Sequence, residues 1–274
     1  MPQPQLDRQS HAEEHLLPVF DLGTAPYEPL QRLQGRLRQG VAEGTVPGVL
    51  LLMEHEPVIT LGSRGTEQDL RDEAGCTTEG SYVLGTGCVP GAGCVRGASC
   101  IPGASDIRAG RPLRVPVVRS ERGGQATLHA PGQLVSYPVV RIPGHDLGAY
   151  VHGLEQTLMV LLAGFGIVAA RRKRHPGLYV DGEKIASVGL RCQRWVASHG
   201  TSLNVDIDTS LFKAIVSCGE ADLRQTSMKT LIGEDLLMAE VKAAYCGAFA
   251  EVFGWALLPT RSLSYTHLEG ALGL

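Results

Sequence analysis

The stretch "GLYVDGEKIASVGLRCQRW", residues 177–195, decides the fold class of this chain of 274 residues. Two strand-like runs flank Asp181-Gly182, with Tyr179 before this dipeptide and Lys184 after it. Asp and Gly tolerate the positive φ angles that both central residues of a two-residue hairpin turn require. The stretch therefore predicts an antiparallel β-hairpin.

Most of the other regular segments are strands as well. Apolar runs predict strands at residues 15–23, 48–62, 113–125, 132–140 and 197–207, with a turn inside the second run at "EHEP". Apolar residues at helical spacing predict helices at 26–44, 147–164 and 233–254. Because the strands cluster with few helices between them, we expect an α+β fold with a mixed β-sheet.

Composition excludes several classes of protein. The net charge of −3 does not indicate a nucleic-acid partner, because proteins that bind nucleic acid favour an excess of Lys and Arg. The first residues lack the basic start and apolar run of a signal peptide, and no stretch approaches the roughly 20 apolar residues of a membrane span. We therefore expect a cytoplasmic protein that contacts neither nucleic acid nor membrane. Its seven cysteines, an odd number, favour reduced thiols over a disulfide framework.

Residues 76–110 differ in composition from the rest of the chain. They are rich in Gly, Ala, Cys, Thr and Ser, and they contain three hexapeptide copies that place cysteines at Cys88, Cys94 and Cys100. Such a segment buries too little apolar surface to order itself, so we expect a low-complexity inserted loop. Zinc ligands are usually two to four residues apart. The cysteines are therefore either incidental to a tandem expansion or the ligands of an unusual metal site.

The stretch "RGGQATLHAPGQLVSY", residues 122–137, is the most unusual part of the chain. Gly123 and Gly124 permit close approach of a ligand to the backbone, and they leave N–H groups that can meet an anion or a carbonyl oxygen. Arg122 and His129 flank these positions. The alternative interpretation is a tight turn with a surface arginine and a packed histidine.

Lys184 and Cys218 are the candidate reactive side chains. A thiol is an effective nucleophile as the thiolate, and a neighbouring ammonium group favours that charged form. The two residues would supply such a pair if the fold brings them together. Alternatively, Lys184 is a solvated hairpin tip and Cys218 is a buried small apolar residue, a description that suits Cys192 and Cys246 better.

Five ordered motifs together resemble the lipoyl/octanoyl transferase family, over nearly the whole chain apart from the insert. They are "EHEPVITLG" at 54–62, "RGGQATLHAPGQ" at 122–133, "KIASVG" at 184–189, "HGTSLNV" at 199–205 and "CG" at 218–219. Three positions depart from the family pattern: Leu128 stands where an aromatic residue is usual, Ala130 where Gly is usual and Ser217 where Pro is common.

The resemblance implies a fold and an activity. The fold is that of biotin and lipoate ligases, a class II synthetase-like single domain with a mixed β-sheet flanked by helices. The activity is transfer of an octanoyl group from octanoyl-acyl carrier protein to lysine ε-amines of lipoyl domains. The acceptors are 2-oxoacid dehydrogenases and the glycine cleavage H protein, and the transfer is the first step of endogenous protein lipoylation. It implies a thioester intermediate on Cys218, acid–base catalysis by Lys184, no cofactor and no metal ion.

The resemblance also implies site residues and boundaries. The acyl pocket is expected to be lined by Arg122, Gly123, Gly124, Gln125, Ala126, Thr127, Leu128, His129, Ala186, Ser187, Val188, His199, Gly200 and Thr201. Backbone N–H groups near Gly123, Gly124 or residues 186–188 would stabilise the oxyanion. The basic run "RRKRH", 171–175, either steers acidic partners or is a solvated loop. The predicted division is a flexible N-terminus at 1–13, a catalytic domain at 14–260 interrupted by the 76–110 loop, and a C-terminal tail at 261–274.

Two other functions remain open on the sequence alone. An ATP-dependent lipoate or biotin protein ligase on the same fold would activate its acid as an adenylate and would need no nucleophilic cysteine. A non-catalytic protein could instead bind a metal or a partner through the Cys-rich loop.

Overall fold

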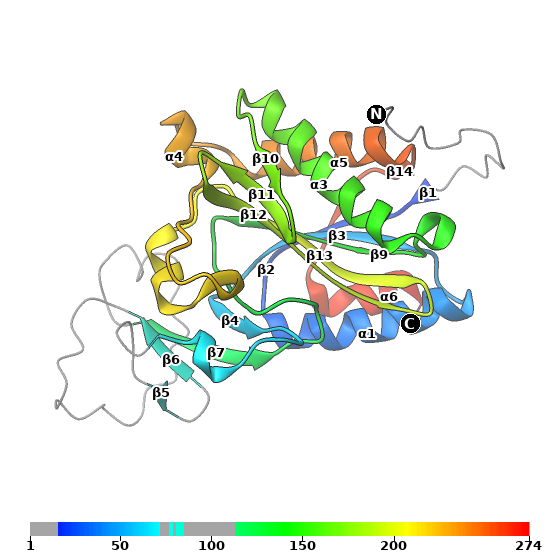
Figure 1. Cartoon of the computed structure of the whole chain (residues 1–274). Coiled ribbons are helices and arrows are strands. Elements are labelled where there is room, and N and C mark those ends of the chain that lie inside the picture. Colours follow the sequence, from blue (N-terminus) through cyan, green and yellow to red (C-terminus); the bar gives the residue numbers. More distant parts are fainter. Residues whose placement is uncertain (1–15, 72–76, 79–80, 85–112, 274) are drawn as a thin grey trace.

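The computed structural model describes residues 16–71, 77–78, 81–84 and 113–273 (Figure 1). The predicted flexible N-terminus at 1–13 and the three hexapeptide cysteines lie outside these residues. Within the described part, no helix combines the length and the apolar character that crossing a membrane demands.

The main sheet has eight strands in the order β10-β11-β12-β13-β9-β3-β2-β15. Their bounds are Val19–Ala25 for β2, Val49–His55 for β3, Gln133–Val139 for β9, Ala170–Arg172 for β10, His175–Val180 for β11, Glu183–Gln193 for β12, Val196–Asn204 for β13 and Arg261–Ser262 for β15. Neighbours from β10 to β3 are antiparallel, whereas β3, β2 and β15 are parallel. The predicted mixed sheet is confirmed.

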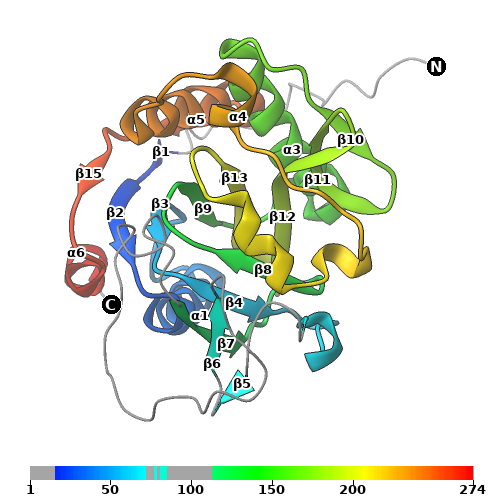
Figure 2. The same ribbon diagram turned by 90° about the vertical axis from the view of Figure 1, so that its left-hand side faces the viewer.

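Helices cover both faces of this sheet (Figures 1 and 2). On one face lie α1, Tyr27–Glu43, and α6, Leu268–Leu272, and on the other lie α3, Leu147–Gly164, and α5, Met238–Phe253. Leu30 and Leu37 of α1 are fully buried in a cluster with the sheet residue Leu51. On the opposite face, Leu158 of α3 and Phe249 of α5 share the second core. The α+β class therefore follows from two apolar layers on one sheet.

The predicted helices at 26–44 and 147–164 are confirmed, and the third is wrong at its start. Gly44 ends α1 with a φ of 76°, in the left-handed region that glycine adopts without strain. The third helix begins at Met238 rather than near Gly233. Gly233, with a φ of 79°, instead ends a short preceding helix, α4, Met228–Ile232.

A five-stranded sheet of order β5-β6-β7-β4-β8 packs beside the main sheet. Its strands are β4 Val58–Leu61, β5 Thr77–Thr78, β6 Ser81–Leu84, β7 Leu113–Arg119 and β8 Ala126–His129. β8 was not expected from the sequence, which predicts strands on either side of it at 113–125 and 132–140. Part of the expected 76–110 loop forms strands, because 81–84 pairs with β7 and 77–78 pairs with 81–84. The other positions of that loop lie outside the described residues.

The remaining elements are short. A two-stranded sheet pairs β1, Leu16–Leu17, with β14, Ala256–Leu257, and the 3₁₀ helices are η1 Glu67–Asp69, η3 Pro143–His145, η4 Thr209–Ala214, η5 Ser217–Gly219 and η6 Tyr265–His267. In the segment described from the sequence as a C-terminal tail, β15 pairs with β2, and Leu268 is buried beside α1. The domain boundaries themselves stay a prediction.

Candidate active site

Lys184 and Cys218 meet at the end of the β11–β12 hairpin. Lys184 Nζ donates a hydrogen bond to Cys218 Sγ at 2.9 Å. Lys184 is only 2% exposed, whereas Cys218 is partly exposed. The structure thus places a buried amine against a thiol that remains open to a substrate. We refer to the two residues as the dyad.

The hairpin directs Lys184 inward. Asp181 and Gly182 form its turn with φ angles of 48° and 83°, and Lys184 pairs with Tyr179 across the two strands. The Tyr179 ring centroid lies 5.6 Å from Lys184 Nζ, which is cation–π distance. A Cβ at Gly177 would overlap the Ala186 carbonyl oxygen of β12 and come 3.1 Å from Lys184 Cε, so glycine at 177 lets the two strands approach beside the lysine side chain. The Tyr179 ring and the Cys218 thiol are thus the contacts of the buried Lys184 amine.

The segment 224–226 fixes the backbone of Lys184. The Lys184 N–H donates to the Arg224 carbonyl oxygen at 2.9 Å, and the Thr226 N–H donates to the Lys184 carbonyl oxygen at 2.9 Å. Asn204 Nδ2 donates to the Thr226 oxygen at 2.9 Å, and Gln133 Nε2 donates to Asn204 Oδ1 at 2.9 Å. Gln133 and Asn204 are almost fully buried, so these hydrogen bonds hold the segment from the interior of the sheet.

Cys218 lies on a strained turn. Its φ is 57°, and that of Gly219 is 73°. A left-handed conformation at a residue other than glycine costs of order 1–3 kcal/mol and persists only where the surroundings enforce it. One side of the turn is anchored by the buried Ile215 and by the Val216 N–H, which donates to the Asp69 carbonyl at 2.7 Å. On the other side a Cβ at 219 would come 2.6 Å from Gln125 Nε2, so the Gln125 amide lies against the turn.

Arg122 shapes the loop that precedes β8. Its Nη2 donates to the Thr60 carbonyl at 2.8 Å and to the Gln125 carbonyl at 2.7 Å, and its Nη1 donates to the Gly123 carbonyl at 3.0 Å. The Gly123 N–H donates to the Leu190 carbonyl of β12 at 2.8 Å. Arg122 is therefore a buried clamp on the glycine turn, which corrects the alternative of a surface arginine. The Gly123 amide is engaged with β12, so it is not available to an oxyanion in this conformation.

His129 belongs to a buried group of rings that we call the aromatic–histidine cluster: Tyr27, His55, His129, Tyr137 and His199. The rings of His129 and Tyr27 are stacked with centroids 6.0 Å apart, and those of His129 and His55 are 5.5 Å apart. His129 Nδ1 lies 2.6 Å from Gln133 Oε1. His55 Nε2 lies 2.8 Å from the Tyr137 hydroxyl.

Burial keeps the histidines of this cluster neutral. It lowers the pKa of His55 to about 4 and that of His199 to about 3, and Arg122 adds a repulsive charge near His199. Burial likewise holds the pKa of His129 well below its usual range, and His55 contributes to the same shift. At neutral pH these rings are uncharged, and those of His55 and His129 are hydrogen-bonded.

The other residues expected in the acyl pocket fall into two sets. Val188 pairs with Thr201, Gly189 with Gly200 and Leu190 with His199, so β12 and β13 bring their parts of the expected pocket side by side. Ala126 and Leu128 are buried in an apolar core with Phe212 and Ile215, beneath the segment that leads to Cys218. These two side chains therefore pack in the core that anchors the chain just before the Cys218 turn. That the whole set lines an acyl pocket stays a prediction.

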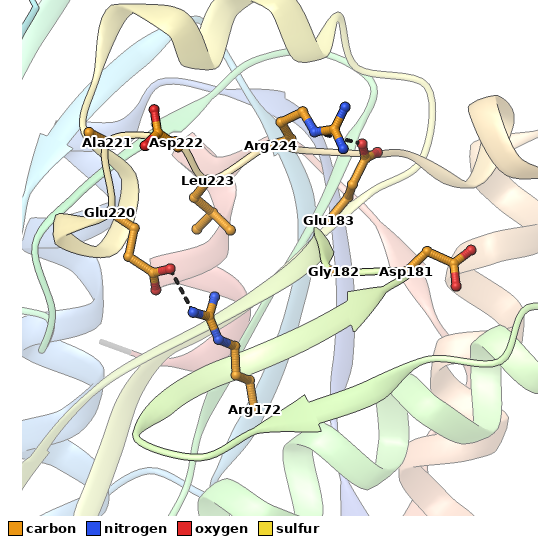
Figure 3. A pocket seen from close by; sticks show the side chains of 9 residues that line it. All are labelled: Arg172, Asp181, Gly182, Glu183, Glu220, Ala221, Asp222, Leu223 and Arg224. Atoms are coloured by element: carbon orange, nitrogen blue, oxygen red, sulfur yellow. Dashed lines mark ion pairs between the residues drawn. The ribbon is translucent and has the colours of Figure 1, made fainter.

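A cavity of about 510 Å³ is lined mostly by residues that lie close to Lys184 and Cys218 in the sequence (Figure 3). It is lined by Arg172, Asp181, Gly182, Glu183, Glu220, Ala221, Asp222, Leu223 and Arg224. Two ion pairs bound it, Arg172 Nη2 to Glu220 Oε2 at 2.8 Å and Arg224 Nε to Glu183 Oε1 at 3.2 Å. Glu183 precedes Lys184 directly, and Glu220 follows Cys218 by two positions. The cavity therefore borders both segments of the chain that carry the dyad.

Sequence comparison decides the family. The lipoyl protein ligase A/B catalytic domain matches residues 105–250. The octanoyltransferase of Rubrobacter xylanophilus is 33% identical over 233 residues, which cover 85% of this chain and 91% of that protein. The octanoyltransferase of Chloroflexus aggregans is 34% identical over 253 residues, which cover 90% of this chain and 99% of that protein. The chain belongs to the octanoyltransferase family.

Solved structures confirm the fold expected of an octanoyltransferase family member. Lipoate-protein ligase A bound with ATP superposes with a TM-score of 0.63 at 13% identity, covering 94% of this chain and 92% of that chain. The putative lipoate protein ligase Ta0514 from T. acidophilum, with bound lipoic acid, gives a TM-score of 0.62 at 13% identity, with the same coverage of both chains. At this identity the likeness shows the fold alone.

The departures from the octanoyltransferase family pattern fall on buried positions. Leu128 and Ala130 are fully buried in the apolar core beneath the thiol segment. Ser217, which directly precedes the thiol, is 6% exposed.

Among the residues that the structure describes, no group of three or more His, Cys, Asp and Glu side chains could hold a metal ion.

Three residues that shape this octanoyltransferase-family site were not singled out from the sequence: Tyr179, Asn204 and Gln133. The hairpin turn at 181–182 carries the signal for Tyr179, because the register of a two-residue turn places that residue opposite Lys184. Asn204 and Gln133 lie within the matched motifs, but their contact depends on the pairing of β9 with β13, which joins distant parts of the chain.

Proposed function

We propose that this chain transfers an octanoyl group from octanoyl-acyl carrier protein to a lysine of a lipoyl domain, through a thioester on Cys218. Family membership makes the protein an acyltransferase. The observation that carries the mechanism is the 2.9 Å separation of Lys184 Nζ and Cys218 Sγ. A buried ammonium group at that distance favours the thiolate, which is the reactive form.

In the first step the Cys218 thiolate attacks the carbonyl carbon of the carrier thioester. A bond forms between Sγ and that carbon, and the bond to the carrier sulfur breaks. The departing carrier thiolate takes a proton from the Lys184 ammonium group. Lys184 is then neutral beside an octanoyl-thioester, with no free proton left in the site.

In the second step the acceptor lysine attacks as a neutral amine. Its nitrogen bonds to the octanoyl carbon, and its excess proton passes to Lys184 Nζ. The bond from carbon to Sγ breaks, which restores the thiolate beside the ammonium group. Because the acyl group enters as a thioester and leaves as a more stable amide, the cycle requires no ATP.

The acceptors in this proposal are the lipoyl domains of 2-oxoacid dehydrogenases and the glycine cleavage H protein, and the reaction takes place in the cytoplasm. The fold alone does not separate this activity from an ATP-dependent ligase, because lipoate-protein ligase A shares it. The dyad favours the transferase, since a ligase that forms an adenylate has no use for an activated thiol.

The test is incubation of the full chain with octanoyl-acyl carrier protein, followed by intact-mass analysis. Wild type should gain one octanoyl group that neutral hydroxylamine removes, as expected of a thioester, and Cys218→Ser should gain none by that route. Cys246→Ala is the matched control, because burial raises the pKa of the Cys246 thiol and keeps it protonated. Full transferase activity in Cys218→Ser, or activity that requires ATP, would contradict the proposal.

A further inference from the structure

The basic run at 171–175 is part of a hairpin rather than a loop. β10 and β11 pair antiparallel, with Arg172 opposite His175, and Lys173 and Arg174 form the turn between them. Both turn side chains are exposed. Neither pairs with a carboxylate anywhere in the part of the chain that the structure describes, so the tip of the β10–β11 turn presents two uncompensated positive charges.

This turn is attached to the dyad on two sides. Glu220, two positions after Cys218, binds both ends of the turn through Arg172 Nη2 at 2.8 Å and His175 Nδ1 at 3.0 Å. The Arg172 guanidinium carbon also lies 5.5 Å from the centroid of the Tyr179 ring, and Lys184 Nζ lies 5.6 Å from the same centroid. A protein that binds the β10–β11 turn is therefore close to the Cys218 thiol.

We propose that the β10–β11 turn is the docking surface for the acidic carrier protein that delivers the thioester. The inference rests on the proposed function and adds the place where the donor binds. Lys173 and Arg174 would attract an acidic surface over a distance set by ionic strength. The ion pairs of Glu220 with Arg172 and His175 hold the β10–β11 turn beside the turn that carries Cys218. A thioester on a flexible arm of the docked carrier can then reach Sγ.

The charges around the neighbouring cavity assign this surface to the donor. Four carboxylates line the cavity, on Asp181, Glu183, Glu220 and Asp222, against the guanidinium groups of Arg172 and Arg224. The excess of negative charge opposes an acidic protein surface and favours a cation, such as the ε-ammonium group of an approaching lysine (Figure 3). The exposed positive charges of the turn have the opposite preference.

The test is the double charge reversal Lys173→Glu/Arg174→Glu in the full chain. At low ionic strength we expect kcat/KM for octanoyl-acyl carrier protein to fall about tenfold with kcat unchanged, and the loss to shrink as salt is added. With octanoyl-pantetheine as donor, which has no protein surface, the variant should equal wild type. Arg32→Glu/Arg194→Glu is the matched control, because it makes the same change in net charge at exposed positions on α1 and at the end of β12.

Three results would overturn the docking proposal: an unchanged kcat/KM with the carrier, an equal loss with octanoyl-pantetheine, or a change confined to KM for the acceptor domain. The third would assign the turn to the acceptor. Wild-type acylation at Cys218 separates this failure from that of the proposed function. If wild type acquires the octanoyl group and the variant is equally fast, only the docking surface is wrong.

Discussion

Two groups of buried ionisable side chains lie within this site, and their environments set them apart. Lys184 is almost fully buried, yet its Nζ donates a hydrogen bond to the Cys218 thiol and lies 5.6 Å from the centroid of the Tyr179 ring. The aromatic–histidine cluster is equally buried, but its histidine rings hydrogen-bond to the neutral Tyr137 and Gln133 side chains, and the nearby Arg122 charge opposes protonation of His199. Burial therefore lowers the pKa of His55 and of His199 and keeps both rings neutral, whereas Lys184 Nζ lies within hydrogen-bond distance of the Cys218 thiol.

The comparison shows that burial alone does not mark a reactive group. The dyad combines a strained, partly exposed turn at Cys218 with a rigid lysine, so a substrate can approach one partner and not the other. The cluster includes a residue with a similar backbone conformation, His199 with a φ of 59°, but that residue is only 2% exposed and offers a substrate no access. The expected role of the cluster is to hold β8 and β9 in place and, through Gln133, the hydrogen bonds that reach the backbone of Lys184.

The largest effect should follow from removing the amine of the dyad. Lys184→Met keeps the length of the side chain but deletes its acid–base function, and we expect kcat/KM for octanoyl transfer to fall by about 10³-fold. Lys242→Met is the matched control, because Lys242 pairs with Asp21 on the α5 side of the sheet. Steady-state kinetics on the folded variants measures both. A Lys184→Met enzyme within tenfold of wild type would remove the dyad from the mechanism.

A smaller loss should follow from disturbing the support of the lysine. Asn204→Asp has the same shape but cannot donate to the Thr226 carbonyl, so the 224–226 segment shifts and kcat should fall by roughly 10–100-fold, with KM little changed. Thr157→Val, which deletes a hydrogen bond to Gly153 within α3, is the control for loss of one hydrogen bond away from the site. If both variants keep wild-type kcat, Asn204 has no positioning role.

The aromatic–histidine cluster should make the protein sensitive to acid. Well above pH 6.5 the histidine rings are neutral in both the folded and the unfolded state, so these groups add no pH dependence there. Between pH 6.5 and about 4, His55 is protonated in the unfolded chain but stays neutral in the folded chain, because burial lowers its pKa to about 4. The free energy of unfolding should therefore fall on acidification, by about 1.4 kcal/mol per pH unit for each such histidine.

Urea unfolding at several pH values measures this slope. His55→Gln should reduce it by about one proton's contribution, whereas replacement of the exposed His267 by Gln should leave it unchanged. Equal slopes for wild type and His55→Gln would show that His55 does not titrate as its burial requires.

The smallest effect concerns Tyr179. Its ring faces Lys184 Nζ at 5.6 Å, and that contact survives in Tyr179→Phe, so activity should stay within about twofold of wild type. Tyr179→Leu removes the ring and should lower kcat several-fold. A ranking with Phe as low as Leu would assign the contribution to the hydroxyl group instead.

Local signals predicted much of the fold. The Asp181-Gly182 turn fixed the hairpin that carries Lys184, and Gly44 marked the end of α1. Gly233 was misinterpreted, because it ends α4 and does not begin the next helix. β8 was missed because its four residues are too few to show the alternation of apolar and polar side chains that indicates a strand. Its strand conformation comes from pairing with β4.

The site was less accessible to sequence reasoning than the fold. Cys218 and Lys184 could be named from the matched motifs, but their contact depends on segment 224–226, which has no regular period and binds to both sides of Lys184. Arg122 shows the same limit. The sequence placed it beside the glycine turn, but only the pairing of β4 with β8 brings Thr60 to its guanidinium group.

The central claim is that Cys218 carries the acyl group between donor and acceptor, and single-turnover transfer tests it most directly. Octanoyl-enzyme, freed of donor and without ATP, is mixed with an apo lipoyl domain, and octanoyl-lysine is followed by quenched mass analysis. We predict complete transfer at a rate at least equal to kcat. An acylated enzyme that transfers more slowly than kcat, or only when ATP is added, would contradict the account.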